Sequence, residues 1–291
     1  MNLIHNDRQT KLIQEYRNSK RKLLTRTKDA YCYEIRRFLL YLNKEPGDAT
    51  YRDIERYLTD DVGTGRKRPL GDRAVNRILS SLRSFYFFLL REGTVQSNIV
   101  DIVERCKIGK RVPAYLKTEE LNDLRKFCHG NILWRVIFEL LYSTGIRRSE
   151  LLGTNVSSLL LETRELKIMR KGGTEGYVRV PQSLISLLQQ YLIWRTEEVK
   201  PKPKEQGLIV SLKGVRMSSN EISYIFRKMT KKTGVHVYPH KLRHTFGTLA
   251  RQRGMSLEQI QKLLGHQQLA TTEWYVHVEP ETGEAYDKAF P

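Results

Sequence analysis

The sequence predicts a mainly helical protein with one small antiparallel β-sheet, divided into two folded units. Apolar residues recur at helical spacing over most of the chain, and two short alternating segments in the second half flank a glycine-rich turn. Residues 107–114 (KIGKRVPA) are basic, contain glycine and proline, and lack periodicity, which is typical of a linker. We therefore expect a helical unit at residues 1–106 and a second unit at residues 115–291.

Helices account for the N-terminal unit. In residues 27–43 one apolar face is formed by Tyr31, Ile35, Phe38 and Leu42, and Thr25 or Thr27 is expected to cap the helix. In residues 72–93 the apolar face is formed by Ile78, Leu82, Phe85 and Leu89, and Gly93 is suited to end the helix. Shorter helices fit around residues 8–20 and 51–60. The basic loop at 63–72 is either a phosphate contact or a solvated turn.

The second unit is expected to alternate helices with one hairpin. Thr118 and two following glutamates begin a helix, and the strongly apolar segment 131–145 is a helix that ends at Gly145. Strands are expected at 165–170 and 177–181, around the turn KGGTEG. The helices expected after the hairpin begin at Ser183, Ser218, Pro239 and Ser256, the second and fourth with capping boxes to Glu221 and Gln259.

The charge balance indicates a polyanionic partner. The formal net charge is +19 and the pI is about 9.8. Residues 1–106 carry 21 Lys and Arg against 14 Asp and Glu, and residues 107–291 carry 30 against 18. Since both halves are basic, two surfaces that grip one nucleic acid explain the excess better than a basic tail. The alternative is a protein that is merely basic.

Several classes of protein are disfavoured by composition. The sequence has no run of about 18 apolar residues, so it predicts no membrane span. The N-terminus also lacks an apolar signal region, so we expect a cytoplasmic protein. Three scattered cysteines, Cys32, Cys106 and Cys128, are too few for a disulfide framework or a zinc cluster.

The segment PHKLRH places His240, Arg243 and His244 on one helical face, at positions i, i+3 and i+4. Zinc proteases use two histidines at this spacing with a glutamate after the first, whereas here Lys241 follows and Arg243 repels a cation. We therefore expect no metal. Arg243 beside His240 suits a phosphate, and His244 is suited to a core position.

Two further segments carry candidate anion-binding groups. The turn at Thr144–Gly145 places Arg147 and Arg148 at the start of a helix, where their charge opposes the helix dipole unless an anion binds. Downstream, Gly265 ends a helix, His266 follows it, and a short helix starting at Thr271 or Thr272 contains Tyr275. By itself Tyr275 is one of 15 tyrosines, most of which are expected to be packing residues.

Together these segments resemble the tyrosine recombinase (phage integrase) family, including its Xer-type members. The matching motifs are TGIRRSEL (144–151), MRKGGTEG (169–176), HKLRH (240–244) and LGHQQLATTEWY (264–275). The helical first third resembles the core-binding domain of that family, so the resemblance covers nearly the whole chain. It implies a helical core-binding bundle followed by a tyrosine recombinase catalytic domain.

The resemblance also implies a catalytic set. Arg147 and Arg243 correspond to the two phosphate-clamping arginines, and the register of the motif favours Arg147 over its neighbour Arg148. Lys171 corresponds to the catalytic lysine. His240 and His266 match the two histidine positions, and Tyr275 matches the nucleophile.

The implied function is site-specific DNA recombination through a 3′-phosphotyrosyl intermediate and a Holliday junction, without metal, cofactor or ATP. Its partners would be double-stranded recombination sites and three further copies in a homo-tetramer, with or without a second recombinase or an accessory protein. The tail 279–291 would dock on a neighbouring protomer or else cap its own domain. The alternatives are a type IB topoisomerase and a catalytically idle DNA-binding accessory protein. Integration, excision and dimer or cointegrate resolution are left open.

Overall fold

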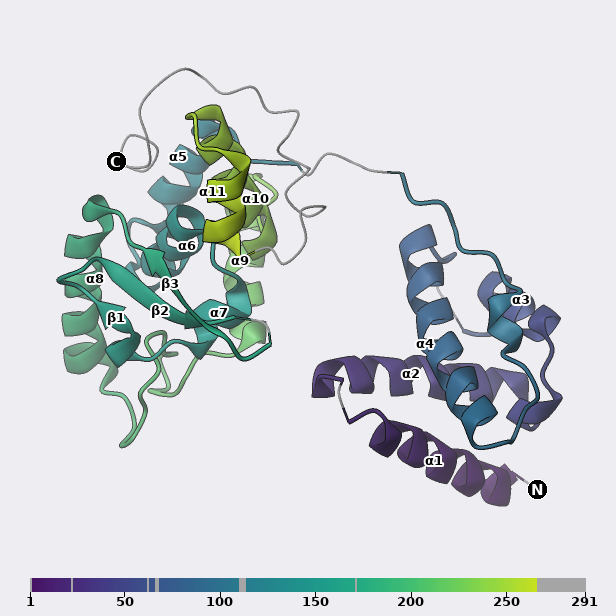
Figure 1. Cartoon of the computed structure of the whole chain (residues 1–291). Coiled ribbons are helices and arrows are strands. Elements are labelled where there is room, and N and C mark those ends of the chain that lie inside the picture. The colour runs from purple at the N-terminus through teal and green to yellow at the C-terminus, as the bar shows by residue number, and fades with distance from the viewer. Residues whose placement is uncertain are drawn as a thin grey trace. The chain divides into compact units, whose positions relative to one another are not determined.

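The chain folds into two units, residues 1–110 and 111–291, which are described separately (Figure 1). The computed structural model describes residues 2–21, 23–61, 63–65, 68–109, 114–170 and 172–265, with the backbone alone for residues 2–6. Helices dominate both units, and the second contains a three-stranded antiparallel sheet. The predicted fold class is therefore confirmed.

The N-terminal unit is a helical bundle. Its helices are α1 (Asn2–Ser19), α2 (Thr25–Leu42), α3 (Tyr51–Thr59) and α4 (Asp72–Arg91), with 3-10 turns η1 (Pro46–Asp48) and η2 (Ile99–Asp101). Helix α2 packs against α4 (Figure 1), and the side chains predicted to face inward, such as Phe38, Leu82 and Phe85, are fully buried. The predicted threonine cap is wrong, because α2 begins at Thr25 and Leu24 occupies the N-cap position.

The second unit is built around α6. Its helices are α5 (Thr118–Cys128), α6 (Ile132–Thr144), α7 (Arg148–Gly153), α8 (Gln182–Trp194), α9 (Ser219–Thr233), α10 (Pro239–Gln252) and α11 (Leu257–Leu264), with a 3-10 turn η3 (Val156–Ser158) and a π-turn η4 (Arg195–Val199). Helix α6 packs against α5, α8 and α10 and is buried along most of its length. Each fully buried Leu or Ile contributes about 1.5–3 kcal/mol, so the burial of α6 is a large part of what stabilises this unit.

The second unit contains one small antiparallel sheet. It consists of β1 (Leu159–Leu160), β2 (Glu165–Met169) and β3 (Glu175–Arg179), in the order β1–β2–β3. The side chains of Leu166, Ile168 and Val178 are buried. The alternation of buried and exposed residues along β2 and β3 confirms the predicted hairpin.

The hairpin turn is tighter than the sequence predicted. Strand β3 begins at Glu175, two residues before the expected Tyr177. The amide of Arg170 donates to the carbonyl oxygen of Thr174 (2.8 Å), and Gly172 and Gly173 have φ angles of 99° and 83°. Because only glycine adopts such angles at little cost, the glycine pair allows this early closure.

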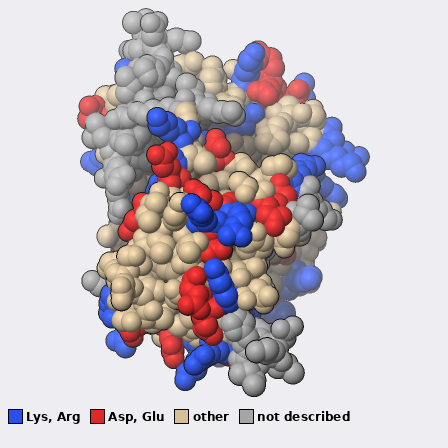
Figure 2. Space-filling view, turned by 90° about the vertical axis from the view of Figure 1, so that its right-hand side faces the viewer, with Lys and Arg blue, Asp and Glu red and all other residues tan. Residues whose placement is uncertain are grey.

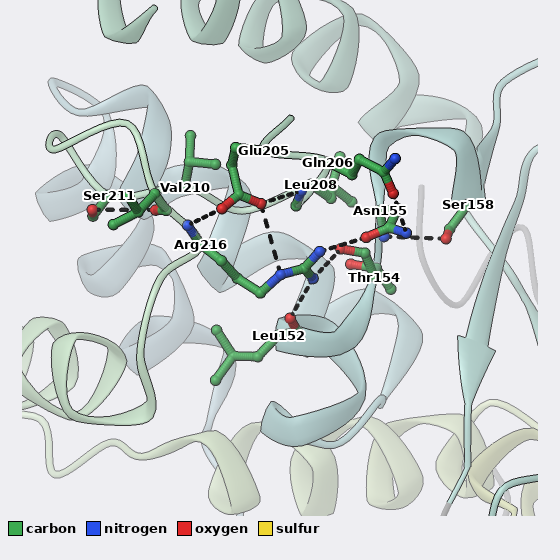
Figure 3. A network of polar contacts seen from close by, with 12 residues as sticks. Leu152, Thr154, Asn155, Ser158, Glu205, Gln206, Leu208, Val210, Ser211 and Arg216 are labelled. Atoms are coloured by element: carbon green, nitrogen blue, oxygen red, sulfur yellow. Dashed lines mark hydrogen bonds and ion pairs between the residues drawn. The ribbon is translucent and has the colours of Figure 1, made fainter. Parts of the chain in front are cut away.

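A polar network joins the end of α7 to the loop before α9 (Figure 3). Nη1 of Arg216 donates to the carbonyl oxygens of Leu152 and Thr154, both at 2.8 Å. The backbone amide of Arg216 in turn donates to the carboxylate of Glu205 (2.8 Å). Since α7 starts directly after Arg147, this network holds in place the helix that begins at the candidate site.

The surface shown in Figure 2 mixes charges of both signs. Lys and Arg side chains lie interspersed with Asp and Glu side chains on this face, so it is not a single basic patch. The N-terminal unit also contains ion pairs, such as Arg77–Glu34 (2.8 Å) and Arg83–Asp101 (2.6 Å). None of the helices in the described ranges has the length and apolar character needed to cross a bilayer.

Replacing Arg216 with alanine should destabilise the second unit. A hydrogen bond to a charged group contributes about 1.5–3 kcal/mol, and the 34% exposure of this side chain puts the expected loss at the lower end. The three tryptophans, Trp134, Trp194 and Trp274, all belong to this unit, so urea unfolding of the full chain followed by tryptophan fluorescence reports on it. Lys213→Ala, on the exposed part of the same loop, is the matched control. Equal midpoints for the two variants would show that the network is not stabilising.

Candidate active site

Three of the six expected site residues lie within the described structure, and two of these, Arg147 and Arg243, meet at the C-terminal end of α11. Nη2 of Arg243 donates to the carbonyl oxygen of Leu264 (2.6 Å), and Nη2 of Arg147 lies 3.5 Å from that of Gly265. The third is His240 on α10. The other three, Lys171, His266 and Tyr275, are outside the described residues, as are the short helix expected near Thr271 and the tail.

Arg243 bridges two helix ends. Its side chain is 4% exposed, and Nη1 donates to the carbonyl oxygen of Gly145 (2.7 Å), the C-cap of α6. The last carbonyls of a helix carry partial negative charge and have no partner within the helix. Two such carbonyls therefore compensate part of the buried charge and fix the plane of the guanidinium group.

Gly145 is required by this arrangement. Its φ is 63°, a left-handed conformation that ends α6 where the sequence predicted. A Cβ atom at this position would lie 2.7 Å from Cδ1 of Phe246 and 2.8 Å from Cδ2 of Leu264. A side chain would push α10 and α11 away from the end of α6, so the glycine permits the close approach that Arg243 spans.

Arg147 is paired with a buried carboxylate. It is the N-cap of α7, and both its backbone amide and its Nη1 atom donate to Glu150 at 2.7 Å. The Glu150 side chain is only 3% exposed. Glu150 is not among the site residues expected from the sequence, although an acid three residues after a helix N-cap is the spacing of a capping box. This carboxylate orients Arg147 and offsets part of the positive charge.

Arg148 points to a different part of the unit. Its Nη1 atom donates to Oγ of Ser223 (2.7 Å) and lies 3.4 Å from the carbonyl oxygen of Ser219, both on α9. Arg148 thus ties α7 to α9, whereas its neighbour Arg147 shares the end of α11 with Arg243.

A further arginine, Arg170, reaches the same helix end. Its Nη2 atom donates to the carbonyl oxygen of Leu263 (3.3 Å). Burial lowers the pKa of Arg170, the nearby charge of Arg147 lowers it further, and Glu150 offsets part of this effect. Arg170 belongs to the motif MRKGGTEG but is not among the site residues expected from the sequence. A cation directly before the expected catalytic lysine was the available signal.

His240 is held in its neutral form by its surroundings. Loss of hydration lowers the pKa of its imidazole, and the charges of Arg243, Arg147 and Arg148 lower it further, while Glu150 acts in the opposite direction. A lowered pKa means that the ring stays unprotonated to a more acidic pH than an exposed histidine.

The second histidine of the motif is the more strongly affected of the two. The ring of His244 lies 6.4 Å from that of His240, measured between centroids, and burial is the main cause that lowers its pKa to about 4. Across the described ranges no group of three His, Cys, Asp or Glu side chains is placed to hold a metal ion.

The arrangement is chemically suited to an anion. Three guanidinium groups and one carboxylate leave an excess of positive charge at the end of α11, beside a neutral imidazole that can accept a proton. Fixed donors of this kind stabilise negative charge that develops during a reaction, because they need no reorganisation.

Replacing Arg243 with glutamine should raise the pKa of His240 toward its ordinary value near 6.5, since it removes the first of the charges that lower it. The pKa is measured by NMR titration of the imidazole Hε1 signal. Arg148→Gln is the control and should have a smaller effect, because Arg148 contributes less. An unchanged or further lowered pKa in Arg243→Gln would contradict the electrostatic account of the site.

Comparison with known proteins identifies the family. The model of the phage integrase family matches residues 114–282, and that of the phage integrase N-terminal SAM-like domain matches residues 11–93. A protein named tyrosine recombinase XerC from Leptospira interrogans is 32% identical over 277 residues, which are 91% of this chain and 87% of that protein. Another XerC, from Pelobacter propionicus, is 33% identical over 287 residues, 94% of this chain and 92% of that one.

Solved structures share the fold. The crystal structure of XerA recombinase is 25% identical, with a TM-score of 0.53, and the alignment covers 94% of both chains. XerH bound to its difH substrate is 20% identical, with a TM-score of 0.70 and coverage of 91% of this chain and 81% of that one. A lambda integrase tetramer on a Holliday junction is 20% identical, with a TM-score of 0.69 and coverage of 89% and 77%. The chain therefore belongs to the phage integrase family and is a tyrosine recombinase similar to the Xer enzymes.

Proposed function

We propose that this recombinase cuts and rejoins specific sites in double-stranded DNA through a covalent bond between Tyr275 and the 3′ phosphate. The observation that carries the proposal is the convergence of Arg147 and Arg243 on the end of α11, next to a neutral His240. Such a site binds a phosphodiester and stabilises the charge that gathers on it during attack.

The two arginines would contact the nonbridging oxygens of the scissile phosphate. Each is charged at any working pH and presents a planar fork that matches a phosphate. Because backbone carbonyls and Glu150 already orient the two side chains, little rotamer entropy remains to be lost when DNA binds. Removal of one donor from such a site typically slows a reaction by about 10²–10³-fold.

The proton transfers are assigned to the remaining groups. Tyr275 has an ordinary pKa near 10 and must lose its proton to attack phosphorus, and neutral His240 accepts that proton. As the Oη–P bond forms, the bond from phosphorus to O5′ breaks, and Lys171 donates a proton to O5′. His266 donates a hydrogen bond to the phosphate. The phosphotyrosyl bond keeps the energy of the broken ester, so attack by a 5′ hydroxyl reseals a strand without ATP.

The partners follow from the relatives. XerH is solved on its difH substrate, and lambda integrase is solved as a dimer on a core site and as a tetramer on a Holliday junction. We assign to this chain the same class of partner: double-stranded recombination sites, a homo-tetramer and a Holliday-junction intermediate. A cytoplasmic location, predicted from the sequence, agrees with a DNA substrate.

The alternative functions are less well supported. A type IB topoisomerase would use the same chemistry. This chain, however, is similar to XerC recombinases over more than nine-tenths of its length, which favours a recombinase. An idle accessory protein would not need Glu150 to orient Arg147 or a neutral histidine beside the arginines.

A groove in the second unit is suited to receive the tail of another copy. It has a volume of about 840 Å³ and lies between α5, α6, the start of α8 and the end of α10. Its leucines are Leu121, Leu184, Leu187 and Leu249. Its Lys and Arg residues are Arg125, Lys126, Arg135 and Arg253, against one glutamate, Glu139, which already binds Arg125 (2.7 Å).

The tail has the complementary composition. Residues 279–291 (EPETGEAYDKAFP) contain four acidic residues, one lysine and two aromatic residues, Tyr286 and Phe290. An acidic segment with apolar side chains matches a basic groove with leucines in its wall. We therefore assign this groove as the docking site for the tail of a neighbouring protomer, which would link the copies of a tetramer.

Covalent capture tests the proposed chemistry. The protein is mixed, without metal or ATP, with nicked duplexes made from the DNA that flanks its own coding sequence. We expect a denaturant-resistant protein–DNA adduct that is absent in Tyr275→Phe, while a gel-shift assay shows equal binding by both proteins. An adduct that persists in Tyr275→Phe would assign the nucleophile elsewhere, and binding without any adduct would favour the accessory-protein alternative.

Synapsis tests the tail. Deletion of residues 280–291 should weaken pairing of two sites more than binding to one half-site, because the tail contacts another protomer. Lys126→Glu with Arg135→Glu should cause the same defect, with no further loss when combined with the deletion. Lys202→Glu with Lys204→Glu, the same charge change outside the groove, serves as the control. Equal loss of synapsis and half-site binding would mean that the tail caps its own domain.

A further inference from the structure

Arg170 has no part in the reaction described above, yet it is built into the site. It follows strand β2, and its Nη2 atom donates to the carbonyl oxygen of Leu263 (3.3 Å), near the end of α11. A Cβ atom on Gly265 would lie 1.8 Å from Nη1 of Arg170. Gly265, the C-cap of α11, therefore lies directly against the guanidinium group, and its φ of 61° is a left-handed conformation that favours glycine.

This contact joins two segments that are far apart in the sequence. Arg170 and Leu263 are separated by 93 positions. Lys171 is the next residue after Arg170, and His266 is the next after Gly265. One side chain thus joins the described residues that directly precede both expected catalytic residues in the sequence.

The backbone of Arg170 is hydrogen-bonded within the β2–β3 turn. The backbone amide of Arg170 donates to Thr174 (2.8 Å), and its carbonyl oxygen accepts a hydrogen bond from Gly173 (3.1 Å). A Cβ atom on Gly176, in the paired strand, would lie 2.5 Å from Nε of Arg170. The partly buried side chain therefore lies between its own hairpin and the end of α11, in contact with both.

The position of Arg170 is electrostatically unfavourable, which suggests that the site needs a charged donor there. Arg170 lies close enough to Arg147 for the two charges to repel, and it is partly buried. Its charge persists, since a guanidinium group is not deprotonated in proteins. The negative end of α11 and Glu150 offset the cost. A neutral residue at position 170 would avoid both the repulsion from Arg147 and the cost of burying a charge.

We propose that Arg170 is a positioning residue that anchors the β2–β3 turn to the end of α11 and so holds Lys171 against the leaving O5′ atom. This inference rests on the proposed role of Lys171. In the step concerned, Lys171 gives a proton to O5′ as the P–O5′ bond breaks and the bond from phosphorus to Tyr275 forms. Arg170 touches neither atom and acts through the turn.

A sulfur leaving group separates this role from general damage to the site. Two versions of the nicked duplex that wild-type protein cleaves are compared, one ordinary and one with sulfur in place of the scissile O5′. A thiol has a pKa near 8.5, whereas water, which stands here for the 5′ alcohol, has a pKa of about 15.7. The sulfur leaving group can therefore depart as a thiolate without a proton donor, and the oxygen leaving group cannot. Arg170→Ala should cut the ordinary duplex at least about 10²-fold more slowly than wild type, which is the lower range for loss of a general acid. It should cut the sulfur duplex at a rate within a few-fold of that of wild type.

Two companion variants make the outcomes distinct. Lys171→Ala should show the same pattern as Arg170→Ala. Lys167→Ala removes a cation that pairs with Glu175 (2.8 Å) on the same hairpin, and it should leave the ratio of the two rates unchanged. If sulfur rescues Lys171→Ala but not Arg170→Ala, or if Arg170→Ala cuts both duplexes normally, the positioning role is overturned while the proposed function stands. If sulfur fails to rescue Lys171→Ala, the proposed role of Lys171 is wrong and the inference falls with it.

Hydrogen exchange of the free protein gives a second readout that needs no DNA. Amides of residues 165–179 should exchange faster in Arg170→Ala than in Lys167→Ala, because the anchor to α11 is lost. Equal exchange in the two variants would contradict the anchoring.

Discussion

The site depends on the contact between arginine side chains and the last carbonyl groups of α11. Arg170, Arg243 and Arg147 approach the carbonyl oxygens of three consecutive residues, 263, 264 and 265. A helix C-terminus carries about half a negative charge, which brings the cations together but does not neutralise them. With one buried carboxylate, Glu150, as the further compensation, positive charge remains in excess, and a phosphate is the group that would balance it.

The apolar core makes this convergence possible. Helix α6 packs against α10, and its left-handed end at Gly145 lets Phe246 and Leu264 approach within contact distance. The same packing buries Arg243 and leaves its hydrogen bonds directed at two helix ends. The segments that bury the core are therefore also those that fix the guanidinium groups. The lowered pKa of His240 follows from both burial and the nearby cations.

Local sequence patterns accounted for most of the fold. Helical spacing located the buried faces of α2 and α4, and Gly145 marked the end of α6 and hence the start of α7 after Arg147. Patterns within a few residues could not show the contacts of Arg170 with α11, because its partner lies 93 positions away. The same holds for the short strand β1 and the early start of β3, which depend on pairing. The roles of Lys171, His266 and Tyr275 still rest on the family resemblance.

In the proposed reaction, arginines neutralise the charge of the scissile phosphate. Replacing one nonbridging oxygen with a methyl group removes that charge while leaving the phosphorus open to attack. The measurement compares the cleavage rates of the ordinary and the methylphosphonate duplex by wild type and by Arg243→Ala. We expect Arg243→Ala to be strongly impaired on the ordinary duplex and close to wild type on the neutral one. An equal loss on both duplexes would contradict it, because the arginine would then act on something other than charge.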